Sequence, residues 1–349
     1  MKKVLLISNK VMLYRIQIYN YFYERFKDEE IEFSVIADKF EKNDNIKFNH
    51  KTLEFNMGKY LDEIKNQKPD YVILFLHILD KVWAPIIAYC KHHNIPVIYW
   101  NHAFIRKSPK SVKNVIYRIQ QNACDAIILY SEDERKYIRK RNKAKTFVAN
   151  NTLNFDYFPE EVYSRNEFTE KYGIREDKIV LFVSRIQKRK KLDVLLDQFQ
   201  SEKDIAVVIV GPGIDEESKS IVDKNSNFYY LGPIYDDYEV NSIFANCDVF
   251  SIPGANGLSI NQAFYWGKPV VTMQGWQGPE IGYLKDGETG FIVKNPLMLK
   301  EKILQLLNDR EMLSRFSENC KKVIKNEANI EKMYKGFYDA IKYCNRNSK

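Results

Sequence analysis

The segment from Ser251 to Val293 contains the residues whose types and spacing best suit chemistry. A β-rich stretch ends at Ile252, a Pro-Gly-Ala-Asn-Gly loop follows, and a helix is expected to open near Leu258 and Ser259 and to end at Gly267. Loop glycines permit close approach of a ligand to the backbone, and the N–H groups of a first helical turn can bind an anion. The same pattern also fits a tight turn that binds nothing, with Ser259 only capping the helix.

Three further candidates carry ionisable groups. Arg185 and the run Lys188-Arg189-Lys190-Lys191 follow an apolar stretch, and their charges suit either a phosphate group or a solvated surface. His102 follows another apolar stretch, where a neutral imidazole can orient a reactive hydroxyl, unless the residue is a hydrogen-bonded core histidine. Glu280, in the sequence GPEIGY, lies near a substrate or only caps the next helix.

Short apolar runs alternate with amphipathic stretches along the chain, which predicts two successive βαβ series. The candidate strands of the first series are Val4–Ser8, Phe33–Ala37, Tyr71–Phe75, Pro96–Trp100, Ala126–Tyr130 and Thr146–Ala149. Those of the second are Ile179–Val183, Ala206–Val210, Phe228–Leu231, Val249–Ile252, Pro269–Thr272 and Gly290–Val293. Such continuous hydrophobicity is typical of parallel strands covered on both faces.

We therefore expect an α/β protein with two Rossmann-like domains that face each other across a cleft. The first is expected over residues 1–155 and the second over 156–325. The stretch from about Glu311 to Tyr343 reads as helical, and a C-terminal helix within 326–349 is expected to pack back on the first domain.

The composition excludes several classes of protein. The chain has 349 residues, 45% hydrophobic and 29% charged, enough for a sizeable core and for two domains of ~100–200 residues. Its 54 basic and 46 acidic residues leave a net charge of +8, which favours an anionic partner without identifying it. The apolar stretch Val4–Ile7 is too short for a signal peptide, and no run approaches the ~18 residues of a membrane-spanning helix.

Cysteine and histidine usage argues against disulfides and metal sites. The five cysteines are scattered without a CxxC pair, which suits a reducing cytosol, and the five histidines form no HExxH motif. We expect a cytoplasmic protein, or one at the inner face of the membrane, without a cofactor or metal. Aromatic residues are spread through both α/β series and no nucleic-acid motif is present, so nucleic acid is not an expected partner.

Dinucleotide binding is also disfavoured. The first strand-to-helix junction, Ser8-Asn9-Lys10-Val11, contains no glycine. Gly211-Pro212-Gly213 follows a strand of the second series, but Glu216 occupies the position of the third glycine and would repel a phosphate. No Walker A sequence occurs.

The sequences GLSINQAFYWGKPVVT and GPEIGYLKDGETGFIV resemble the donor-side signature of GT-B glycosyltransferases, specifically the large retaining family 4. FVSRIQKRKKLDVLLDQF is similar to the Arg-x4-Lys phosphate-binding segment of that family, and IVGPG, YYLGPI and FANCDVFSIPG follow its course. The resemblance covers most of the second domain. In the first domain it is looser and rests on YRIQIYNYF, VIYWNHAF and VANNTLN.

The resemblance implies roles for individual residues. It places Arg185 and Lys190 beside the donor diphosphate and His102 near the donor phosphate and the acceptor hydroxyl, which makes these three the expected catalytic residues. The expected donor-binding residues are Gly211, Gly257, Leu258, Ser259, Gln262 and Glu280. Tyr14 and Arg15 are expected either to bind an anionic acceptor or to be structural.

Three departures from the family pattern stand out. The Glu-x7-Glu pattern of the family falls here on Gly254 and Gln262, so that both acids are missing. Asn256 and Asn261 are the nearest polar candidates to replace the first acid. Lys191 stands where the family usually has glycine, which puts the local turn in doubt.

The implied activity is metal-independent, retaining transfer of a sugar from a nucleotide-sugar donor to a hydroxyl of a glycan or lipid-linked acceptor, in surface polysaccharide or glycolipid assembly. Basic clusters at Arg106-Lys107-Lys110-Lys113 and Arg135-Lys136-Arg139-Lys140-Arg141, with Phe104 and Tyr137, suggest contact with an anionic membrane, or are solubilising faces. The missing acids leave an alternative, a catalytically silent nucleotide-binding subunit of a partner.

Overall fold

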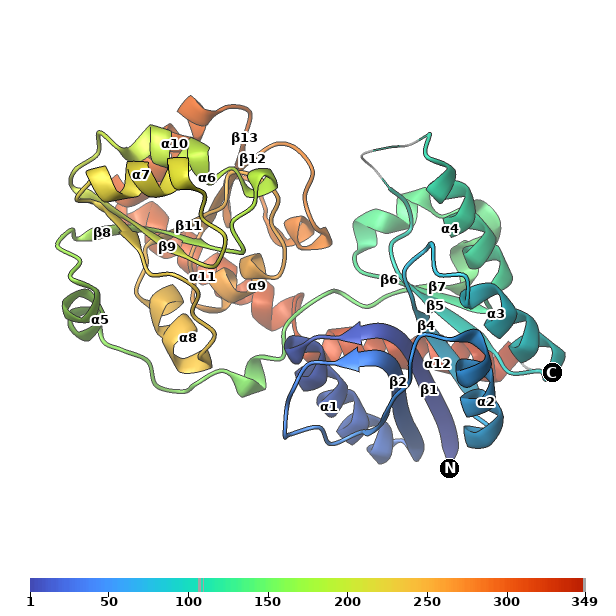
Figure 1. Cartoon of the computed structure of the whole chain (residues 1–349). Helices are drawn as coiled ribbons and strands as arrows, with labels where there is room; N and C mark the ends of the chain where they lie inside the picture. Colours follow the sequence, from blue (N-terminus) through green and yellow to red (C-terminus); the bar gives the residue numbers. More distant parts are fainter. Residues whose placement is uncertain (106–107, 109, 348–349) are drawn as a thin grey trace. The chain divides into compact units, whose positions relative to one another are not determined.

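The structure is a computed structural model that describes residues 1–105, 108 and 110–347. The chain divides into two compact units (Figure 1). Unit 1 consists of Met1–Asn154 and Asn329–Lys349, and unit 2 of Phe155–Ala328. Each unit contains one sheet whose paired strands are all parallel.

The sheet of unit 1 has seven strands in the order β3-β2-β1-β4-β5-β6-β7. The strands are β1 (Lys2–Val11), β2 (Ile31–Phe40), β3 (Asn49–Thr52), β4 (Tyr71–Phe75), β5 (Val97–Trp100), β6 (Ala126–Leu129) and β7 (Thr146–Val148). The helices are α1 (Leu13–Asp28), α2 (Met57–Gln67), α3 (Trp83–His92), α4 (Val112–Ala123) and α12 (Ile330–Asn347), with two 3₁₀ turns, η1 (Glu132–Tyr137) and η2 (Lys140–Lys145).

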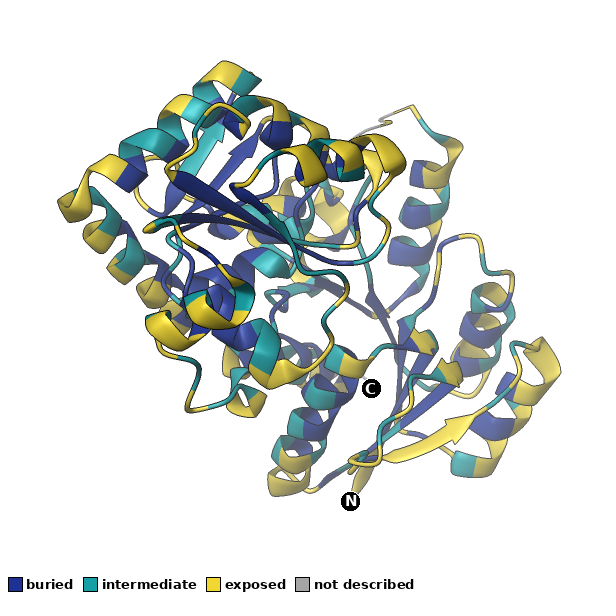
Figure 2. Cartoon of the chain, turned by 60° about the vertical axis from the view of Figure 1, so that its left-hand side comes forward, coloured by how far each residue is buried: buried dark blue, intermediate teal, exposed yellow. Residues whose placement is uncertain are grey.

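Alternating side chains of the central strand build two cores, one on each face of this sheet. Val4 and Leu6 of β1 belong to the core that includes residues of α1 and α12. Leu5 and Ile7 belong to the core on the other face, with residues of α2, α3 and α4. Most strand residues are buried while the helices keep exposed outer faces (Figure 2). Burial on both faces is the reason why these strands are apolar without interruption.

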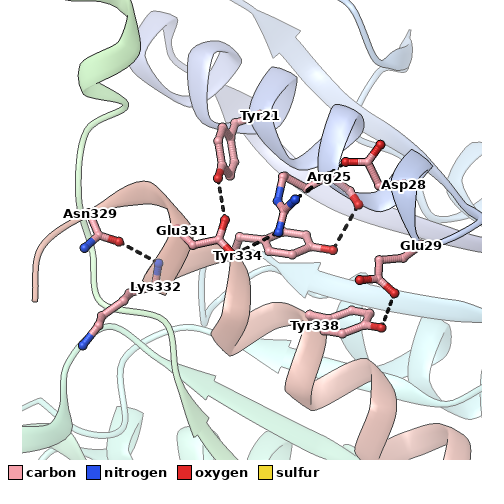
Figure 3. A network of polar contacts seen from close by, with 9 residues as sticks. All are labelled: Tyr21, Arg25, Asp28, Glu29, Asn329, Glu331, Lys332, Tyr334 and Tyr338. Atoms are coloured by element: carbon pink, nitrogen blue, oxygen red, sulfur yellow. Dashed lines mark hydrogen bonds and ion pairs between the residues drawn. The ribbon is translucent and has the colours of Figure 1, made fainter. Parts of the chain in front are cut away.

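The C-terminal helix α12 is part of unit 1. Phe337 lies in the same core as Phe22 of α1, with ring centroids 4.8 Å apart. At the helix surface, Glu331 accepts hydrogen bonds from Tyr21 and Arg25 of α1, at 2.5 and 3.0 Å (Figure 3). A Cβ on Gly336 would lie 2.4 Å from the carbonyl oxygen of Val148, so a glycine is needed for α12 to lie this close to β7.

The sheet of unit 2 has six strands in the order β10-β9-β8-β11-β12-β13. The strands are β8 (Lys178–Val183), β9 (Ile205–Val210), β10 (Phe228–Tyr230), β11 (Val249–Ser251), β12 (Val270–Met273) and β13 (Gly290–Val293). The helices are α5 (Arg165–Tyr172), α6 (Leu192–Phe199), α7 (Glu216–Lys224), α8 (Asp237–Ala245), α9 (Ser259–Tyr265), α10 (Pro296–Asn308) and α11 (Arg310–Asn326), with 3₁₀ turns η3 (Phe155–Tyr157), η4 (Lys188–Lys190) and η5 (Pro279–Tyr283).

The strand order determines where each unit can bind a ligand. In unit 1 the order reverses between the neighbours β1 and β4, and in unit 2 between β8 and β11. The loops that follow two such strands diverge to opposite sides and leave room between them at the carboxyl ends, which is where open α/β sheets bind ligands. The residues of greatest interest therefore follow β1 and β4, or β8 and β11.

The α/β class with two Rossmann-like parallel sheets is confirmed, and every predicted strand is present with shifts of a few residues at its ends. Strand β3 was not predicted, because Asn49–Thr52 is an exposed, polar edge strand without an apolar signal. The expected continuous helical stretch from Glu311 to Tyr343 is interrupted after Asn326. Asn329 starts the next helix, where its side chain accepts a hydrogen bond from the Lys332 N–H at 2.9 Å.

Candidate functional site

In unit 2, the loop after β8 lies directly against the loop after β11. The N–H of Gly254 donates to the carbonyl oxygen of Lys190 at 3.0 Å, and the N–H of Ala255 donates to that of Arg189 at 2.9 Å. These two hydrogen bonds fix the backbone of η4 against the loop that follows β11. The basic run and the glycine-containing loop, 60 or more residues apart in sequence, thus form one structural feature.

The contact explains the glycine at position 254. A Cβ there would lie 2.1 Å from the carbonyl oxygen of Arg189, so that no side chain fits without moving backbone. The backbone of η4 therefore leaves no room at this position for the acid of the family pattern. Lys191, the other departure, adopts the left-handed conformation with φ +56° and ψ 49°. The turn that a glycine would favour is therefore formed by a lysine, at a cost of about 1–2 kcal/mol.

Lys190 is the most unusual ionisable residue of this site. It is only 8% exposed, and its Nζ donates a hydrogen bond to the carbonyl oxygen of Ala255 at 2.5 Å. The pKa of Lys190 is lowered to about 8, mainly by burial and also by the charge of Arg189, while Glu280 acts in the opposite direction. The ammonium group is thus held largely out of water without a carboxylate in salt-bridge contact among the described residues.

Glu280 lies on the other side of the same loop. It is 3% exposed, in the first turn of η5, and the Gly278 N–H before it donates to the carbonyl oxygen of Asn256 at 3.2 Å. A Cβ on Gly278 would lie 2.5 Å from a carboxylate oxygen of Glu280 and 3.5 Å from the Cα of Gly257. The structure therefore brings Glu280 to the glycine loop and within electrostatic range of Lys190.

The side chain of Asn256 hydrogen-bonds groups of its own unit, a role that differs from the expected replacement of the missing acid. Its side-chain Nδ2 donates to the carbonyl oxygens of Ile252 and Gly254, both at 3.0 Å, and to Thr272 Oγ1 at 2.9 Å. Gln277 completes this brace, because its Nε2 donates to the Gly254 carbonyl oxygen at 3.0 Å. Asn256 therefore holds the loop in place. Gln277 and Thr272 carried no sequence signal, since their role depends on the folded loop.

Four of the expected donor-binding residues lie on the loop and on α9 after it. Gly257, Leu258 and Ser259 are all partly exposed at the start of this helix. The helix has seven residues, and Gly267, with φ +66°, follows its end in the expected left-handed conformation. Gln262 is half-buried and donates from its amide to Asn241 of α8 at 3.1 Å. Its amide is thus used within unit 2.

Arg185 and Gly211, the remaining residues expected on the donor side, lie beside the end of β8. Arg185 is exposed, in contrast to Lys190. Gly211, with φ +134°, follows β9, and a Cβ there would lie 1.9 Å from the carbonyl oxygen of Ser184. Gly211 is thus required for close packing of two strand-end loops, and no direct ligand contact is needed to account for it.

In unit 1, His102 follows β5 and pairs with Glu134 of η1. Its Nδ1 lies 2.6 Å from a Glu134 carboxylate oxygen, while the imidazole side chain is 43% exposed and that of Glu134 only 5%. The other carboxylate oxygen accepts from the N–H of Ala103 at 3.3 Å. A histidine held in this way keeps a fixed ring orientation and leaves Nε2 for other partners.

Helix α4 fixes the loop that follows His102. Asn114 accepts from the N–H of Ile105 at 2.7 Å and donates to the Ser108 carbonyl oxygen at 2.9 Å. Gln121 donates to the carbonyl oxygen of Ala103 at 2.9 Å. Buried amide side chains thus connect α4 to the loop, and this explains why the inward face of the helix is polar.

Tyr14 and Arg15 begin α1, after β1. Arg15 is 4% exposed, and its guanidinium carbon lies 4.5 Å from the Trp100 ring centroid, 5.0 Å from that of Phe75 and 5.3 Å from that of Tyr14. These aromatic residues come from the ends of β4 and β5 and from α1. Arg15 therefore lies at the point where the strand order of unit 1 reverses.

The basic clusters of unit 1 are partly internal. Arg106 and Lys107 lie outside the described residues. Arg135 donates to the Thr146 carbonyl oxygen at 2.8 Å, so that it is held by its own unit. Phe104 and Tyr137, which accompany these clusters, are half-buried and stacked on each other with ring centroids 5.3 Å apart.

The described residues include neither a metal-binding cluster nor a membrane-spanning helix. Among them, no cluster of three or more His, Cys, Asp or Glu side chains is placed to hold a metal ion. Asp236 caps α8 by accepting from the Glu239 N–H at 2.9 Å. No helix in this part of the chain is long and apolar enough to cross a membrane. The five cysteines are free thiols and are buried.

Comparison with known proteins shows that this chain is similar to glycosyltransferases. Residues 164–323 match the family model described as glycosyl transferases group 1. An uncharacterized glycosyltransferase of Methanocaldococcus jannaschii is 26% identical over 241 residues, which are 66% of this chain and 63% of that protein. The chain spans between 46% and 63% of the length of the first three curated relatives that it matches.

Two solved structures are similar over nearly the whole chain. The Anabaena protein HepE, in complex with UDP, has a TM-score of 0.78 at 14% identity, covering 98% of this chain and 100% of that one. The sucrose-phosphate synthase of Thermosynechococcus elongatus has a TM-score of 0.75 at 16% identity, covering 98% of each chain. At such low sequence identity, the structural similarity establishes the fold alone.

Proposed function

We propose that this chain, which matches the glycosyl transferases group 1 model over residues 164–323 and shares the fold of HepE and sucrose-phosphate synthase, is a retaining glycosyltransferase. It takes a sugar from a nucleotide-sugar donor and transfers it to a hydroxyl of a glycan or lipid-linked glycan, in the assembly of a surface polysaccharide or glycolipid. A solved neighbour, HepE, is in complex with UDP, which supports a nucleotide-based donor.

The observation that carries this proposal is the buried ammonium group of Lys190. Its pKa of about 8 keeps it largely protonated near neutral pH, although burial disfavours the charge. A donor diphosphate would supply the missing negative charge at the point where the loops after β8 and β11 meet. Arg185 would add a second positive charge from the exposed side, and the N–H groups near Gly257 would contribute hydrogen bonds.

The reaction balances without an enzymic nucleophile. The bond between the sugar C1 and the leaving phosphate oxygen breaks, and a new bond forms between C1 and the acceptor oxygen on the same face. The proton of the acceptor hydroxyl passes to the leaving phosphate. Lys190 and Arg185 stabilise the charge that develops on the phosphate. His102, oriented by Glu134, orients the acceptor hydroxyl.

We propose that the transfer is metal-independent, with the two basic side chains in the place of a divalent cation. The measurement is transfer in buffer with excess EDTA. We expect an unchanged rate, whereas loss of transfer that Mg²⁺ or Mn²⁺ restores would refute metal independence and leave the role of Lys190 to be tested separately.

The experiment that tests the function is a transfer and hydrolysis assay with a panel of UDP-, GDP- and ADP-sugars. Replacing Lys190 by alanine is expected to lower kcat/KM by about 10²–10³-fold, the usual effect of removing one preorganised group from a dry site. Lys188→Ala is the matched control, since Lys188 lies exposed in the same turn. Nucleotide binding without turnover by the wild type, measured by thermal shift, would instead favour a catalytically silent subunit.

We also propose that unit 1 attaches to an anionic membrane through α4, which carries an apolar stripe on its outer face. Val112, Val115 and Ile119, three and four residues apart, are 76%, 52% and 50% exposed. Lys113 is exposed beside them. The polar face of this helix is directed inward and its apolar stripe outward. An exposed apolar stripe with a basic residue at its edge is typical of a helix that lies in a membrane interface.

Co-sedimentation with vesicles tests the attachment. The full chain is expected to bind vesicles that contain phosphatidylglycerol at low salt and to be released by high salt, since each basic residue near the surface contributes about 1 kcal/mol. The double substitution Val115→Asp and Ile119→Asp should abolish binding. Leu297→Asp is the control, because Leu297 is 75% exposed in unit 2. Equal binding of all three proteins would exclude α4 as the contact.

A further inference from the structure

Arg15 is a buried charge without an acidic partner. It is 4% exposed, and no carboxylate within the described residues forms an ion pair with it. Its Nε and Nη1 atoms are buried, and neither has a hydrogen-bond partner within the part of the chain that the structure describes. The Tyr14 side chain hydrogen-bonds the guanidinium, but this contact leaves Nε and Nη1 unsatisfied. Buried donors of a charged group are normally satisfied in a folded protein.

Two more buried polar atoms in the same cluster lack a hydrogen-bond partner among the described residues. They are the indole Nε1 of Trp100, over whose ring Arg15 lies at 4.5 Å, and the hydroxyl of Tyr19, whose ring is 6.4 Å from that of Trp100. The guanidinium and indole groups can only donate hydrogen bonds. Burial raises the pKa of Tyr19, so that its hydroxyl stays protonated and can donate as well. Apart from the tyrosine hydroxyls, one of which already pairs with Arg15, the described part of the cluster offers buried donors and no charged acceptor.

We propose that this cluster is the receptor for an oxyanion of the acceptor substrate, a phosphoryl or carboxylate group, with Arg15 as the residue that binds it. The proposal rests on the glycosyltransferase function and specifies its acceptor as an anionic molecule. A planar guanidinium suits both oxyanions, because each can accept two parallel N–H bonds.

Cation–π contacts alone do not account for the cluster. The rings of Trp100, Phe75 and Tyr14 attract the charge of Arg15, but they do not accept its in-plane N–H groups as an oxygen does. The rings do explain how Arg15 stays in place without an anion. The aromatic residues hold the guanidinium ready, and the oxyanion completes its hydrogen bonds.

The position of the cluster favours a substrate over a purely structural ion. Arg15 follows β1, and Phe75 ends β4, the two strands between which the order of the sheet reverses. Tyr130 connects the cluster to His102, because its ring lies 6.0 Å from that of Trp100 and 4.8 Å from the imidazole. An oxyanion at Arg15 would therefore place the rest of an acceptor near His102.

The test uses the full chain labelled with ¹⁵N in its tryptophan indoles. The sequence has four tryptophans, and Trp100→Phe identifies the signal of Trp100. Methyl phosphate and methyl glucuronide are titrated separately as probes. We expect a saturable shift of the Trp100 indole signal with at least one of them. A response to methyl phosphate alone indicates a lipid phosphate, and a response to methyl glucuronide alone indicates an acidic sugar.

Variants distinguish an anion receptor from a structural arginine. Arg15→Met should weaken the response at least about 10-fold, the effect of losing a charged hydrogen bond, and Arg15→Lys should retain part of it. Arg118→Met is the matched control, because Arg118 also lies over an aromatic ring, at 5.8 Å from Phe104, but on α4. If Arg15→Met does not fold, the titrations of the wild type and of Arg15→Lys still show whether Arg15 binds the anion.

An unmoved Trp100 signal with both probes in the wild type, or an equal shift in Arg15→Lys, Arg15→Met and wild type, would overturn the proposal. This outcome is separate from failure of the glycosyltransferase function. Donor turnover depends on Lys190 in unit 2 and is measured without an acceptor, as hydrolysis. The Trp276 indole, 5.6 Å from the Arg189 guanidinium, reports anion binding on the donor side within the same spectra.

Discussion

Replacing Lys190 by methionine should make the protein more stable near neutral pH while it removes donor binding. Methionine fills a similar volume and carries no charge. The pKa of Lys190 falls from 10.5 to about 8 on folding, because the ammonium group is buried. At about 1.4 kcal/mol per pH unit this corresponds to about 3 kcal/mol of unfavourable charge burial. Part of the gain is lost again, since the Ala255 carbonyl oxygen loses its hydrogen bond.

The pH dependence of the free energy of unfolding determines how the stability difference between Lys190→Met and the wild type changes with pH. Below pH 8 both the folded and the unfolded chain hold the proton of Lys190, and the full penalty applies. Between pH 8 and 10.5 the unfolded chain binds more protons, so that the free energy of unfolding of the wild type rises with pH. Lys190→Met lacks this contribution. The stability difference between the variant and the wild type should therefore shrink by about 3 kcal/mol across this range.

The assay is thermal unfolding of wild type, Lys190→Met and Lys188→Met from pH 7 to 10.5. Other groups titrate equally in all three proteins, so that differences isolate Lys190. For a unit of this size, 1 kcal/mol corresponds to roughly 2–4 °C in Tm. Parallel Tm curves for wild type and Lys190→Met would refute the buried-charge reasoning. A variation in Lys188→Met as large as that in Lys190→Met would show that position in the turn, not burial, is responsible.

Three more substitutions test particular contacts. Gly254→Glu restores the acid of the family pattern but should destabilise the protein by more than about 3 kcal/mol and not raise activity, because its Cβ would lie 2.1 Å from a backbone oxygen; urea unfolding and transfer assays decide. Lys191→Gly should stabilise by up to about 1 kcal/mol through relief of the left-handed backbone, and a lower urea midpoint would contradict this. Glu134→Gln should lower kcat through His102 with little change in donor affinity, and an unaltered kcat would remove Glu134 as a positioning residue.

The sequence predicted those elements whose signal is local. Continuous apolar runs identified the buried strands, and the glycine and proline after α9 identified its end, where Gly267 has φ +66°. The polar edge strand β3 gave no such signal. Its residues are all exposed, and only pairing with β2 defines it.

The site was predictable in its residue types but not in its contacts. The basic run and the glycine loop both stood out in the sequence, whereas the approach of the Arg189 carbonyl oxygen to Gly254 depends on how two strand ends meet. Glu134 lies 32 residues after its partner His102, in a segment whose sequence signal comes from its basic residues. The sequence placed Asn256 next to the missing acid, but its side-chain amide donates hydrogen bonds to carbonyl oxygens of its own loop.

The most direct test of the donor site is a crystal structure of the chain with UDP, the nucleotide that HepE binds. We predict a phosphate oxygen about 3 Å from the Nζ of Lys190, which would exchange its bond to the Ala255 carbonyl oxygen for one to the nucleotide. UDP bound elsewhere, or bound while Lys190 keeps its bond to Ala255 and does not touch a phosphate, would contradict the proposed donor site.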